Sequence, residues 1–512
     1  MAEASRKDRI VGGVRQDLAH DSAVKQVTGR AYYIDDLPEP PDLLHIQVGM
    51  SEKAHARVVG MDLSAVRESP GVVVVLTASD VPGINDASPF AGDDPIFADG
   101  LVEYVGQALF AVAAETREAA RMAAMRAIVT YEELEAATTL SAALERDMDL
   151  LPKREMCLGD PERALAEAKH RLSGFIEIGG QDHFYLEGQV AMAVPGEDRD
   201  LLIYASTQHP SEVQHNAAKA LGLTSKDVTV EVRRMGGAFG GKESQASHIA
   251  SIAALVADAT GRAAKLRLDR DDDMILTGKR HDFRIDYDVG FDDEGRIHGL
   301  TFLQAARCGR SADLSAAIAD RAMFHADNAY FLANARITSR RLKTHSVSNT
   351  AFRGFGGPQG MVGIERILDE IALERGLDPL DVRKANLYGD NGRNITPYHM
   401  EVTDNVAPDI IETLERSSDY RARRKLTREF NRRNSVLKKG IALTPVKFGI
   451  SFTTAHLNQA GALLHIYNDG SIHLNHGGTE MGQGLFMKVA QVVAEVLQVD
   501  QAKIKITATT TA

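Results

Sequence analysis

The chain has 512 residues, of which 59 are Lys or Arg and 71 are Asp or Glu, so its formal net charge is −12. At ~150 residues per domain this length predicts about three domains, and 44% hydrophobic with 25% charged residues excludes wholesale disorder. The acidic balance argues against nucleic acid as the main partner, because phosphates need a basic face. The two cysteines, Cys157 and Cys308, are too few for an iron–sulfur cluster or a structural zinc site, and the composition argues against a disulfide.

The sequence carries no visible targeting signal. Its first residues lack an apolar core of signal-peptide length, and no apolar stretch approaches the ~20 residues that span a bilayer. We therefore expect a cytoplasmic protein that does not associate with a membrane.

The first part of the chain predicts a polar tail over residues 1–22 and a small α+β domain over 23–137. The β-branched run 72–76 indicates a buried strand, and the apolar run 108–113 indicates another. A helix is expected to follow, because a Thr side chain caps helix N-termini well. That helix runs from the cap at Thr116 to about residue 127, and a connector is expected over 138–160.

The second region, residues 161–404, alternates predicted helices and strands. Proline is favoured in the first turn of a helix and glycine just after its end, so these residues mark the boundaries. The predicted elements are a helix from Pro210 to Gly222, a helix over 244–259 before Gly261, a hairpin turn at 292–295, a helix over 361–375 and a turn-rich boundary at 388–405.

The third region, residues 405–512, begins with a basic segment over 421–433, which we interpret as the solvated face of a helix rather than a partner site. The later elements have clear local signals, including an Asn-Asp-Gly turn between alternating segments. They are a hairpin turn at 468–470, a helix over 484–497 and a strand over 503–507. The last residues resemble a domain that stops part-way.

Three glycine-rich segments carry the chemistry. They are RMGGAFGGKE at 234–243, NTAFRGFGGPQG at 349–360 and HGGTEMGQG at 476–484, and each precedes a predicted helix. Glycines let backbone N–H groups approach a bulky anionic ligand, and a helix N-terminus adds further donors. Three such loops with embedded Arg, Gln and Glu predict one large, phosphate-bearing cofactor, whereas a single loop would be read as an ordinary turn.

Familiar nucleotide and calcium motifs are approached but not completed. The P-loop spacing in the first segment ends in Glu243, where Ser or Thr should hold magnesium. A dinucleotide-like pattern has Gln359 in place of its third glycine. The acidic run 269–273 has Met274 where a calcium loop needs glycine, so we interpret it as a solvated turn. A P-loop NTPase is therefore a distant alternative, which an ATP hydrolysis assay would close.

The three segments, in this order, resemble those of the molybdenum hydroxylase family, and most closely the molybdenum-binding subunits of its xanthine dehydrogenases. The resemblance runs from about residue 19 onward. Further matching stretches are GQDHFYLE at 180–187, STQHP at 206–210, DRDDD at 269–273, TGKRH at 277–281 and KFGISF at 447–452. It implies an α+β fold with an N-terminal hammerhead domain over 23–137, a first molybdopterin-binding domain over 161–404 and an incomplete second one over 405–512.

The resemblance also implies roles for individual residues. The cofactor is a molybdenum–molybdopterin whose dithiolene sulfurs, rather than protein side chains, hold the metal. The residues implied at the cofactor are Gln208, Phe239, Gly240, Arg353 and Gln483. Those implied at the substrate are Glu243 and Arg321, which also have catalytic roles, together with Phe355, Phe452 and Thr453.

These implied roles agree with the chemistry of the residues. Two aromatic rings, Phe355 and Phe452, can stack on a flat purine. Arg321 can stabilise the negative charge that develops on the ring, and Glu243 can hydrogen-bond a ring nitrogen. A buried Glu and Arg without polar substrate groups would be costly, which favours a purine over a simple aldehyde. From composition alone, an ion pair of Arg321 with Asp320 and core packing of the two phenylalanines would be the simpler readings.

Two departures from the family pattern stand out. Ala238 occupies a position where the family usually has glycine, which needs a compatible backbone angle. The Gly-Glu-Pro-Pro motif that carries the family's general-base glutamate is absent from this sequence. The chain thus corresponds to roughly the first two-thirds of such a subunit, as a fragment, an interrupted frame or one piece of a split subunit. We expect no hydroxylase activity from the isolated chain and weak retention of the cofactor.

The resemblance implies a heteromer. A partner subunit would carry the 2Fe-2S clusters and FAD, because this chain has two cysteines and no dinucleotide motif. Two other functions stay open: a hydroxylase for another N-heterocycle or an aldehyde, which a substrate panel would separate, and a non-catalytic remnant, which the absence of molybdenum would support.

Overall fold

The computed structural model describes residues 10–390 and 392–512. None of the helices in this described part is long and apolar enough to cross a membrane. The α-helices are α2 (Ala23–Val27), α3 (Ser64–Arg67), α4 (Arg117–Ala124), α5 (Leu140–Glu145), α6 (Pro161–Glu167), α7 (Pro210–Leu221), α8 (Gln245–Thr260), α9 (Arg270–Leu276), α10 (Ser315–Phe324), α11 (Gly357–Arg375), α12 (Pro379–Asn386), α13 (Ala407–Ser417), α14 (Tyr420–Arg433) and α15 (Leu485–Leu497).

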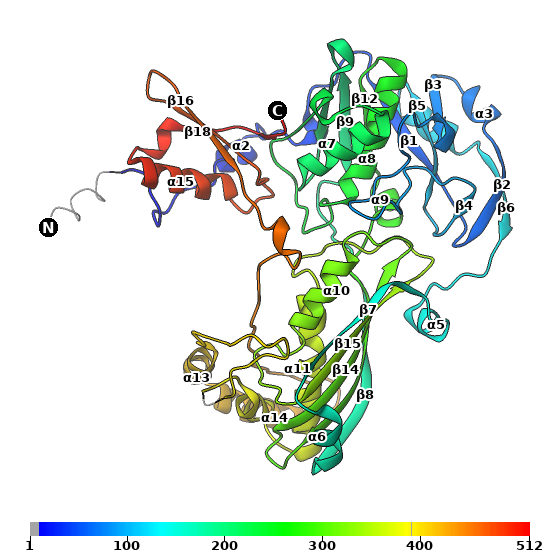
Figure 1. The fold of residues 1–512 in the computed structure, drawn as a ribbon. Helices are drawn as coiled ribbons and strands as arrows, with labels where there is room; N and C mark the ends of the chain where they lie inside the picture. Colours follow the sequence, from blue (N-terminus) through cyan, green and yellow to red (C-terminus); the bar gives the residue numbers. More distant parts are fainter. Residues whose placement is uncertain (1–9, 391) are drawn as a thin grey trace.

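An eight-stranded mixed sheet forms the centre of the upper body in Figure 1. Its strands, in spatial order, are β19 (Thr509–Thr510), β11 (Val228–Val232), β10 (Leu201–Ala205), β9 (Val190–Pro195), β12 (Ala264–Arg267), β1 (Leu44–Met50), β5 (Ala108–Ala114) and β3 (Val72–Thr77). Helices α7 and α8 pack against the strands of this sheet. The strands of the predicted N-terminal domain therefore continue the sheet of the following region, through parallel pairing of β1 with β12.

Strand β5 separates two apolar cores and is buried along its whole length. Ala111 and Ala113 lie in the core that α8 contributes to, whereas Leu109 and Val112 lie in a second core with Val66 of α3. A small three-stranded sheet, β4 (Leu101–Val102), β2 (Ala56–Asp62) and β6 (Ile128–Glu133), adds side chains to the second core. The apolar run at 108–113 is thus a buried strand, as predicted.

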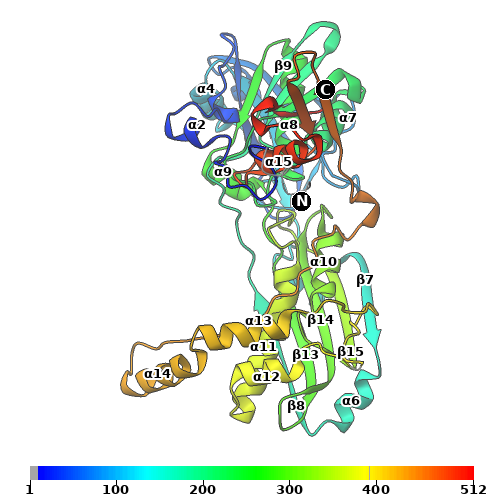
Figure 2. The same cartoon turned by 90° about the vertical axis from the view of Figure 1, so that its left-hand side faces the viewer.

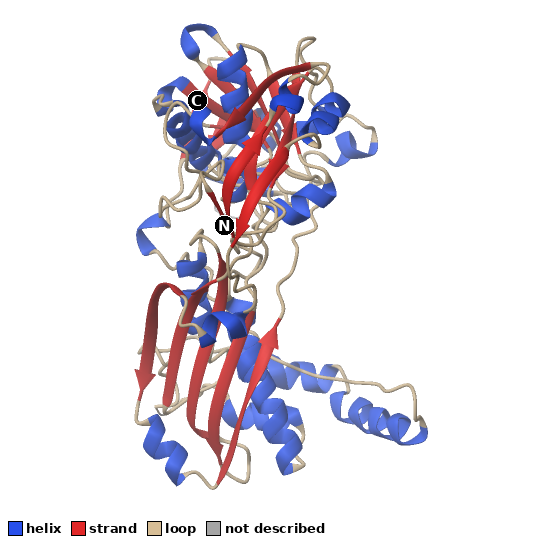
Figure 3. Cartoon of the chain, turned by 90° about the vertical axis from the view of Figure 1, so that its right-hand side faces the viewer, coloured by secondary structure: helices blue, strands red, loops and turns tan. Residues whose placement is uncertain are grey.

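A five-stranded sheet organises the lower body, which Figure 3 shows face-on. Its strands, in spatial order, are β7 (Asp149–Leu158), β15 (Ala335–Lys343), β14 (Ile297–Gly309), β13 (Phe283–Phe291) and β8 (His170–Ile178). Alternate residues of β13 are buried, which is the pattern of a sheet with one covered face. The apolar stripe of α11 covers that face, with Ile364, Ile367 and Ile371 fully buried.

The C-terminal part forms a small sheet of β16 (Ala462–Ile466), β17 (Ile472–His476) and β18 (Ile504–Ile506), covered by α15. The final strand β19 then returns to the edge of the large sheet. The hairpin formed by α13 and α14 projects from the lower body in Figure 2. Most of α14 is exposed, as expected of a solvated helix.

Local predictions agree with the structure at several helix ends. Thr116 caps α4 through a 3.1 Å bond from the backbone N–H of Ala119, and α4 ends at Ala124, three residues earlier than predicted. Gly222 and Gly261 end α7 and α8 in the left-handed conformation. The turn at 292–295 joins β13 to β14, and that at 468–470 joins β16 to β17.

Other predictions are corrected. The acidic run at 269–273 is not a solvated turn: it begins helix α9, and Asp273 is buried, where it accepts a 2.7 Å hydrogen bond from the Tyr185 hydroxyl. Strand β3 lies at the sheet edge, with Val73 exposed. The expected connector contains α5 and β7. Part of the expected polar tail lies outside the described residues, but Ile10 is buried against α15 and β17.

Candidate cofactor and substrate site

A cavity of about 580 Å³ lies where the three glycine-rich loops meet. We call residues 234–243 the first loop, 349–360 the second and 476–484 the third. Each contributes to the cavity wall, although they are far apart in the chain. The predicted site residues that line it are Gln208, Phe239, Gly240, Glu243, Arg353, Phe355 and Gln483.

A buried ion pair between Lys242 and Glu187 holds the first loop in place, and no local sequence pattern indicated it. The Lys242 ammonium donates hydrogen bonds to the Glu187 backbone carbonyl at 2.7 Å and to Ser206 Oγ at 2.8 Å. It also lies 3.3 Å from Glu187 Oε2, which accepts a 2.9 Å bond from the Gly236 N–H. Burial lowers the pKa of Lys242 to about 8. One carboxylate thus holds both ends of the loop, and Lys242 does not line the cavity.

Gln208 links helix α7 to the first loop. Its side-chain oxygen accepts a 2.9 Å bond from the Gly240 N–H, and its backbone N–H donates to the Lys242 carbonyl at 2.8 Å. The Gln208 NH₂ group has no partner among the described residues, so it can serve a ligand. This geometry suits the cofactor contact that the resemblance implies.

The first and second loops touch one another at strained positions. Phe239 and Phe355 both have positive φ, at 56° and 51°, which side-chain-bearing residues rarely adopt and which cluster at functional sites. A Cβ at Gly240 would lie 2.7 Å from the Ala351 carbonyl, so only glycine fits this contact. Ala238 has no such positive φ, which explains why alanine is accommodated there.

Glu480 organises the third loop, and the sequence analysis did not single it out. Its carboxylate accepts bonds from the N–H groups of Gly482 and Gly484, at 2.9 and 3.0 Å, and from Phe486 at the start of α15. Burial acts to raise its pKa, but these donors hold the pKa of Glu480 below its usual range. The Gln483 side chain bonds within the loop, to the Met481 N–H and the Thr479 carbonyl.

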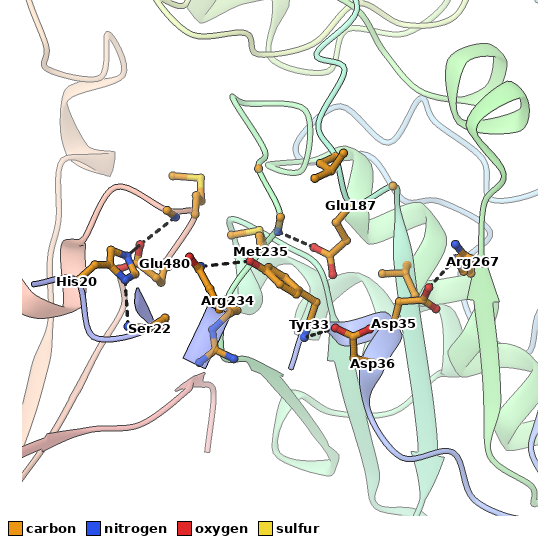
Figure 4. A pocket seen from close by; sticks show the side chains of 18 residues that line it. His20, Ser22, Tyr33, Asp35, Asp36, Glu187, Arg234, Met235, Arg267 and Glu480 are labelled. Carbon is orange, nitrogen blue, oxygen red and sulfur yellow. Dashed lines mark hydrogen bonds and ion pairs between the residues drawn. The ribbon is translucent and has the colours of Figure 1, made fainter. Parts of the chain in front are cut away.

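A second cavity of about 450 Å³ lies beside the first and shares Met481 and Gly482 with it. Figure 4 shows its lining, with Glu480 and His20 on one side and Arg267 and Asp35 on the other. His20, Asp21 and Glu480 are the one metal-ligand-like cluster within residues 10–390 and 392–512. Asp21 is bonded to Arg233 at 2.5 Å and His20 to Glu480 at 3.2 Å, so the cluster is a hydrogen-bonded network.

The residues around the first cavity fit a bulky, polar cofactor. Gly482, at a φ of 101°, has open space where a Cβ would stand, so a side chain there would enter the cavity. The exposed Arg353 guanidinium makes no ion pair in the described part of the chain and can meet an anionic group. The donors available are Arg353, the Gln208 amide and backbone N–H groups.

Glu243 lines the same cavity, half-buried, and its carboxyl group makes no hydrogen bond within the described residues. Burial, helped by the nearby Glu212 and Asp313 carboxylates and opposed by His209, raises the pKa of Glu243 to about 7. The group can therefore hold a proton near neutral pH.

Arg321 is buried in α10 and does not pair with Asp320, which bonds instead to Arg341. The Arg321 guanidinium donates to the backbone carbonyls of Gly449 and Ser451 and lies 5.5 Å from the centre of the Phe355 ring. Burial lowers the pKa of Arg321 from its usual value. Arg321 thus contacts Phe355, a predicted substrate residue, and also holds the segment around Gly449 and Ser451 through its backbone carbonyls.

The two predicted sandwich rings lie side by side. The ring centres of Phe355 and Phe452 are 5.3 Å apart and their planes are inclined by 52°. A flat ligand stacked between the two rings needs about 7 Å between the ring planes, which is twice the usual contact distance. Thr453 lies nearby and donates to the Ala317 carbonyl at 3.1 Å. The structure brings these residues together, and their roles remain predictions.

Comparisons with known proteins decide the family. Residues 28–135 match the aldehyde oxidase and xanthine dehydrogenase a/b hammerhead domain, and 147–387 and 413–512 match molybdopterin cofactor-binding domains. The chain belongs to the aldehyde oxidase and xanthine dehydrogenase family. The predicted fold class and the molybdopterin-binding domains are therefore confirmed, whereas the exact domain boundaries stay predictions.

The relatives are long chains. Xanthine dehydrogenase/oxidase of Gallus gallus is 42% identical over 510 residues, which are 99% of this chain and 37% of that protein. Xanthine dehydrogenase of Blastobotrys adeninivorans is 42% identical over 514 residues, 99% of this chain and 36% of that protein. The chain spans little more than a third of the curated relatives it matches.

Solved structures show the same fold. Aldehyde oxidoreductase from Desulfovibrio gigas has a TM-score of 0.83 at 26% identity, covering 96% of this chain and 56% of that chain. Quinoline 2-oxidoreductase from Pseudomonas putida 86 has a TM-score of 0.86 at 23% identity, covering 99% of this chain and 68% of that chain.

Proposed function

We propose that this chain is the molybdopterin-binding part of a cytoplasmic xanthine dehydrogenase that hydroxylates hypoxanthine and xanthine to urate, with water as the oxygen source. One observation carries the proposal: a half-buried carboxyl group, Glu243, faces the cavity of the cofactor loops, and Arg321 meets the aromatic ring of Phe355, which lines the same cavity. A polar heterocycle offers partners for both groups, and an apolar aldehyde does not.

The chain's own residues would bind and orient the purine. Phe355 and Phe452 would stack on its faces once they separate. Arg321 would stabilise negative charge on the ring, and its burial strengthens this effect. Glu243 would hold a proton at its carboxyl group. The molybdenum cofactor, held by Gln208, Arg353, Gln483 and the backbone at Phe239 and Gly240, supplies the two-electron oxidation when bound.

We also propose that a partner subunit takes part in the activity. The sequence has no Gly-Glu-Pro-Pro motif and spans little more than a third of its curated relatives. We propose that the 2Fe-2S clusters and FAD are carried by a partner subunit in a hetero-oligomer, and that these 512 residues alone are inactive because they lack the motif of the general base.

The test uses the complex purified with this chain from its native source. Its molybdenum content is measured, and turnover is compared for hypoxanthine, xanthine, quinoline and benzaldehyde in ¹⁸O-labelled water. We expect labelled urate and at least a tenfold preference for the purines. A preference for quinoline or the aldehyde would reassign the substrate, and a complex without molybdenum would make the chain a non-catalytic remnant.

A further inference from the structure

Two of the sequence stretches that match the family have no part in the proposed function. They are GQDHFYLE at 180–187, between β8 and β9, and TGKRH at 277–281, between α9 and β13. The structure brings them together, because the Lys279 ammonium lies 3.0 Å from the Asp182 carboxylate. The two stretches therefore form one unit, although about 100 residues separate them in the chain.

This unit contacts the second loop through one aromatic ring. Phe352 lines the first cavity, and two buried side chains hold its ring. The His183 ring stacks on it with the ring centres 4.5 Å apart, and the central carbon of the Arg280 guanidinium lies 3.9 Å from the centre of the ring. His183 is 6% exposed and Arg280 is 8% exposed. An imidazole and a cation packed on an aromatic ring both favour one orientation of that ring.

The same two side chains also hold the backbone on both sides of this ring. His183 Nε2 donates a 2.6 Å hydrogen bond to the Ala351 carbonyl, and Arg280 Nη2 donates at 3.1 Å to the Arg353 carbonyl. The Arg353 N–H in turn donates at 2.8 Å to the Phe239 carbonyl of the first loop. The main chain of Arg353 is thus fixed at both ends, whereas its exposed guanidinium makes no ion pair within the described residues.

His183 also packs against the first loop. A Cβ on Gly241 would lie 2.6 Å from the His183 ring, so the ring lies directly on that glycine. Burial and the Lys279 and Arg280 charges lower the pKa of His183 to about 4, against the effect of the bond to the Ala351 carbonyl. The imidazole is therefore neutral at neutral pH, and its one N–H remains available for that bond.

Arg280 is a buried cation without a carboxylate beside it. Its Nε donates at 2.8 Å to the Gln181 side chain, but Nη1 is buried without a hydrogen-bond partner among residues 10–390 and 392–512. Burial lowers the pKa of Arg280 to about 10. A buried charge that no opposite charge compensates is costly, and an anionic ligand at the neighbouring Arg353 would reduce that cost.

We propose that His183 and Arg280 are positioning residues, which fix the second loop so that Arg353 presents its guanidinium to an anionic group of the cofactor. An arginine whose backbone is already held loses less freedom on binding, so the affinity rises without any new contact. The positive charge of Arg280 favours the same anion. The inference rests on the proposed function, since it takes Arg353 as a cofactor-binding residue.

The test measures how fast the purified complex loses molybdenum during dialysis, with the metal quantified by mass spectrometry. Arg353→Met should lose it about tenfold faster, as expected when a hydrogen bond to a charged group is removed. Arg280→Met and His183→Leu should each lose it about three- to tenfold faster. Arg284→Met, which removes a guanidinium 4.4 Å from the ring of the exposed Phe175, is the matched control and should leave the rate unchanged.

A double-mutant cycle separates positioning from general support of the fold. Arg280→Met combined with Arg353→Met should lose molybdenum no faster than Arg353→Met alone, because the group to be positioned is already gone. If the Arg280→Met chain does not assemble, Arg280→Lys, which keeps the charge and loses the planar group, takes its place. Rates that multiply in the double variant would overturn the inference.

A conservative variant tests the hydrogen bond to the second loop. His183→Gln keeps a side-chain N–H donor, so it should retain molybdenum longer than His183→Leu. Equal losses in the two variants would overturn the role of His183. Failure of the proposed function would look different: the molybdenum losses would still not multiply, but quinoline or the aldehyde would be turned over instead of a purine. A complex that never contains molybdenum would overturn both.

Discussion

The first loop and residues 447–453, which carry predicted cofactor and substrate residues and which we call the first and second walls, are held in different ways. The first loop rests on the Lys242–Glu187 pair, which does not line the first cavity, with Lys242 fully buried against Glu187 and Ser206. The second wall, residues 447–453, has no helix or strand and is largely exposed. It is attached through the Arg321 guanidinium, which holds the Gly449 and Ser451 carbonyls, and through a 3.0 Å bond from the Gly449 N–H to His325.

The residues that hold the first loop are not predicted substrate residues, whereas the residue that holds the second wall is. The Lys242–Glu187 pair can keep the first loop in place without lining the first cavity. Arg321, by contrast, is both the attachment of the second wall and a predicted substrate residue. A substrate that takes up the Arg321 donors must compete with two backbone carbonyls, so substrate binding and the position of residues 447–453 are coupled.

The largest effect on stability is expected when the buried cation that holds the first loop is removed. Lys242→Met removes the cation beside the largely buried Glu187 carboxylate, which keeps only neutral hydrogen-bond donors, and this should lower the free energy of unfolding by about 3–5 kcal/mol. Urea denaturation of the chain measures this. Lys226→Met, which removes an exposed partner of Asp227, is the control and should cost less than about 1 kcal/mol. An equal, small loss in both would show that the buried pair does not hold the loop.

An intermediate effect is expected in the hydrogen exchange of residues 447–453, the second wall, when Arg321 is replaced. Arg321→Met removes two charge-assisted bonds, worth about 2 kcal/mol together after solvent exchange. Hydrogen exchange measured by mass spectrometry should then be at least tenfold faster across residues 447–453 and unchanged across the first loop. Arg366→Met, an exposed arginine of α11 paired with Glu370, should change neither. Faster exchange in both walls would mean that they are not independent.

The smallest effect on stability is expected from a glycine substitution that tests whether the third loop contacts the cofactor. Gly482→Ala and Gly470→Ala share the same backbone problem, since φ is 101° and 80°, and both have open space for a methyl group. Each should cost about 1 kcal/mol. Only Gly482 lines the cavity, so only Gly482→Ala should reduce the molybdenum content of the purified complex. Equal molybdenum loss in both variants would place the cofactor elsewhere.

Much of the local structure could be predicted from the sequence, because the signals act over a few residues. Pro210 and Gly222 bound α7 through the fixed φ of proline and the left-handed φ of glycine. The motifs of the three loops also sufficed to predict a molybdopterin-binding fold. They did so by resemblance, since composition alone would have paired Arg321 with its neighbour Asp320.

Only the tertiary structure decided which distant residues share a site. The pairing of Leu44 with Ala264 joins two predicted domains in one sheet, and no local pattern encodes that choice. Asp273 looked solvated because its neighbours are acidic, yet Tyr185 and Thr277 satisfy it in the interior. Glu187 and Lys242 are 55 residues apart, and each is an ordinary charged residue by sequence. Their roles arise because burial removes water, and the only compensating charge is the one that the fold brings beside them.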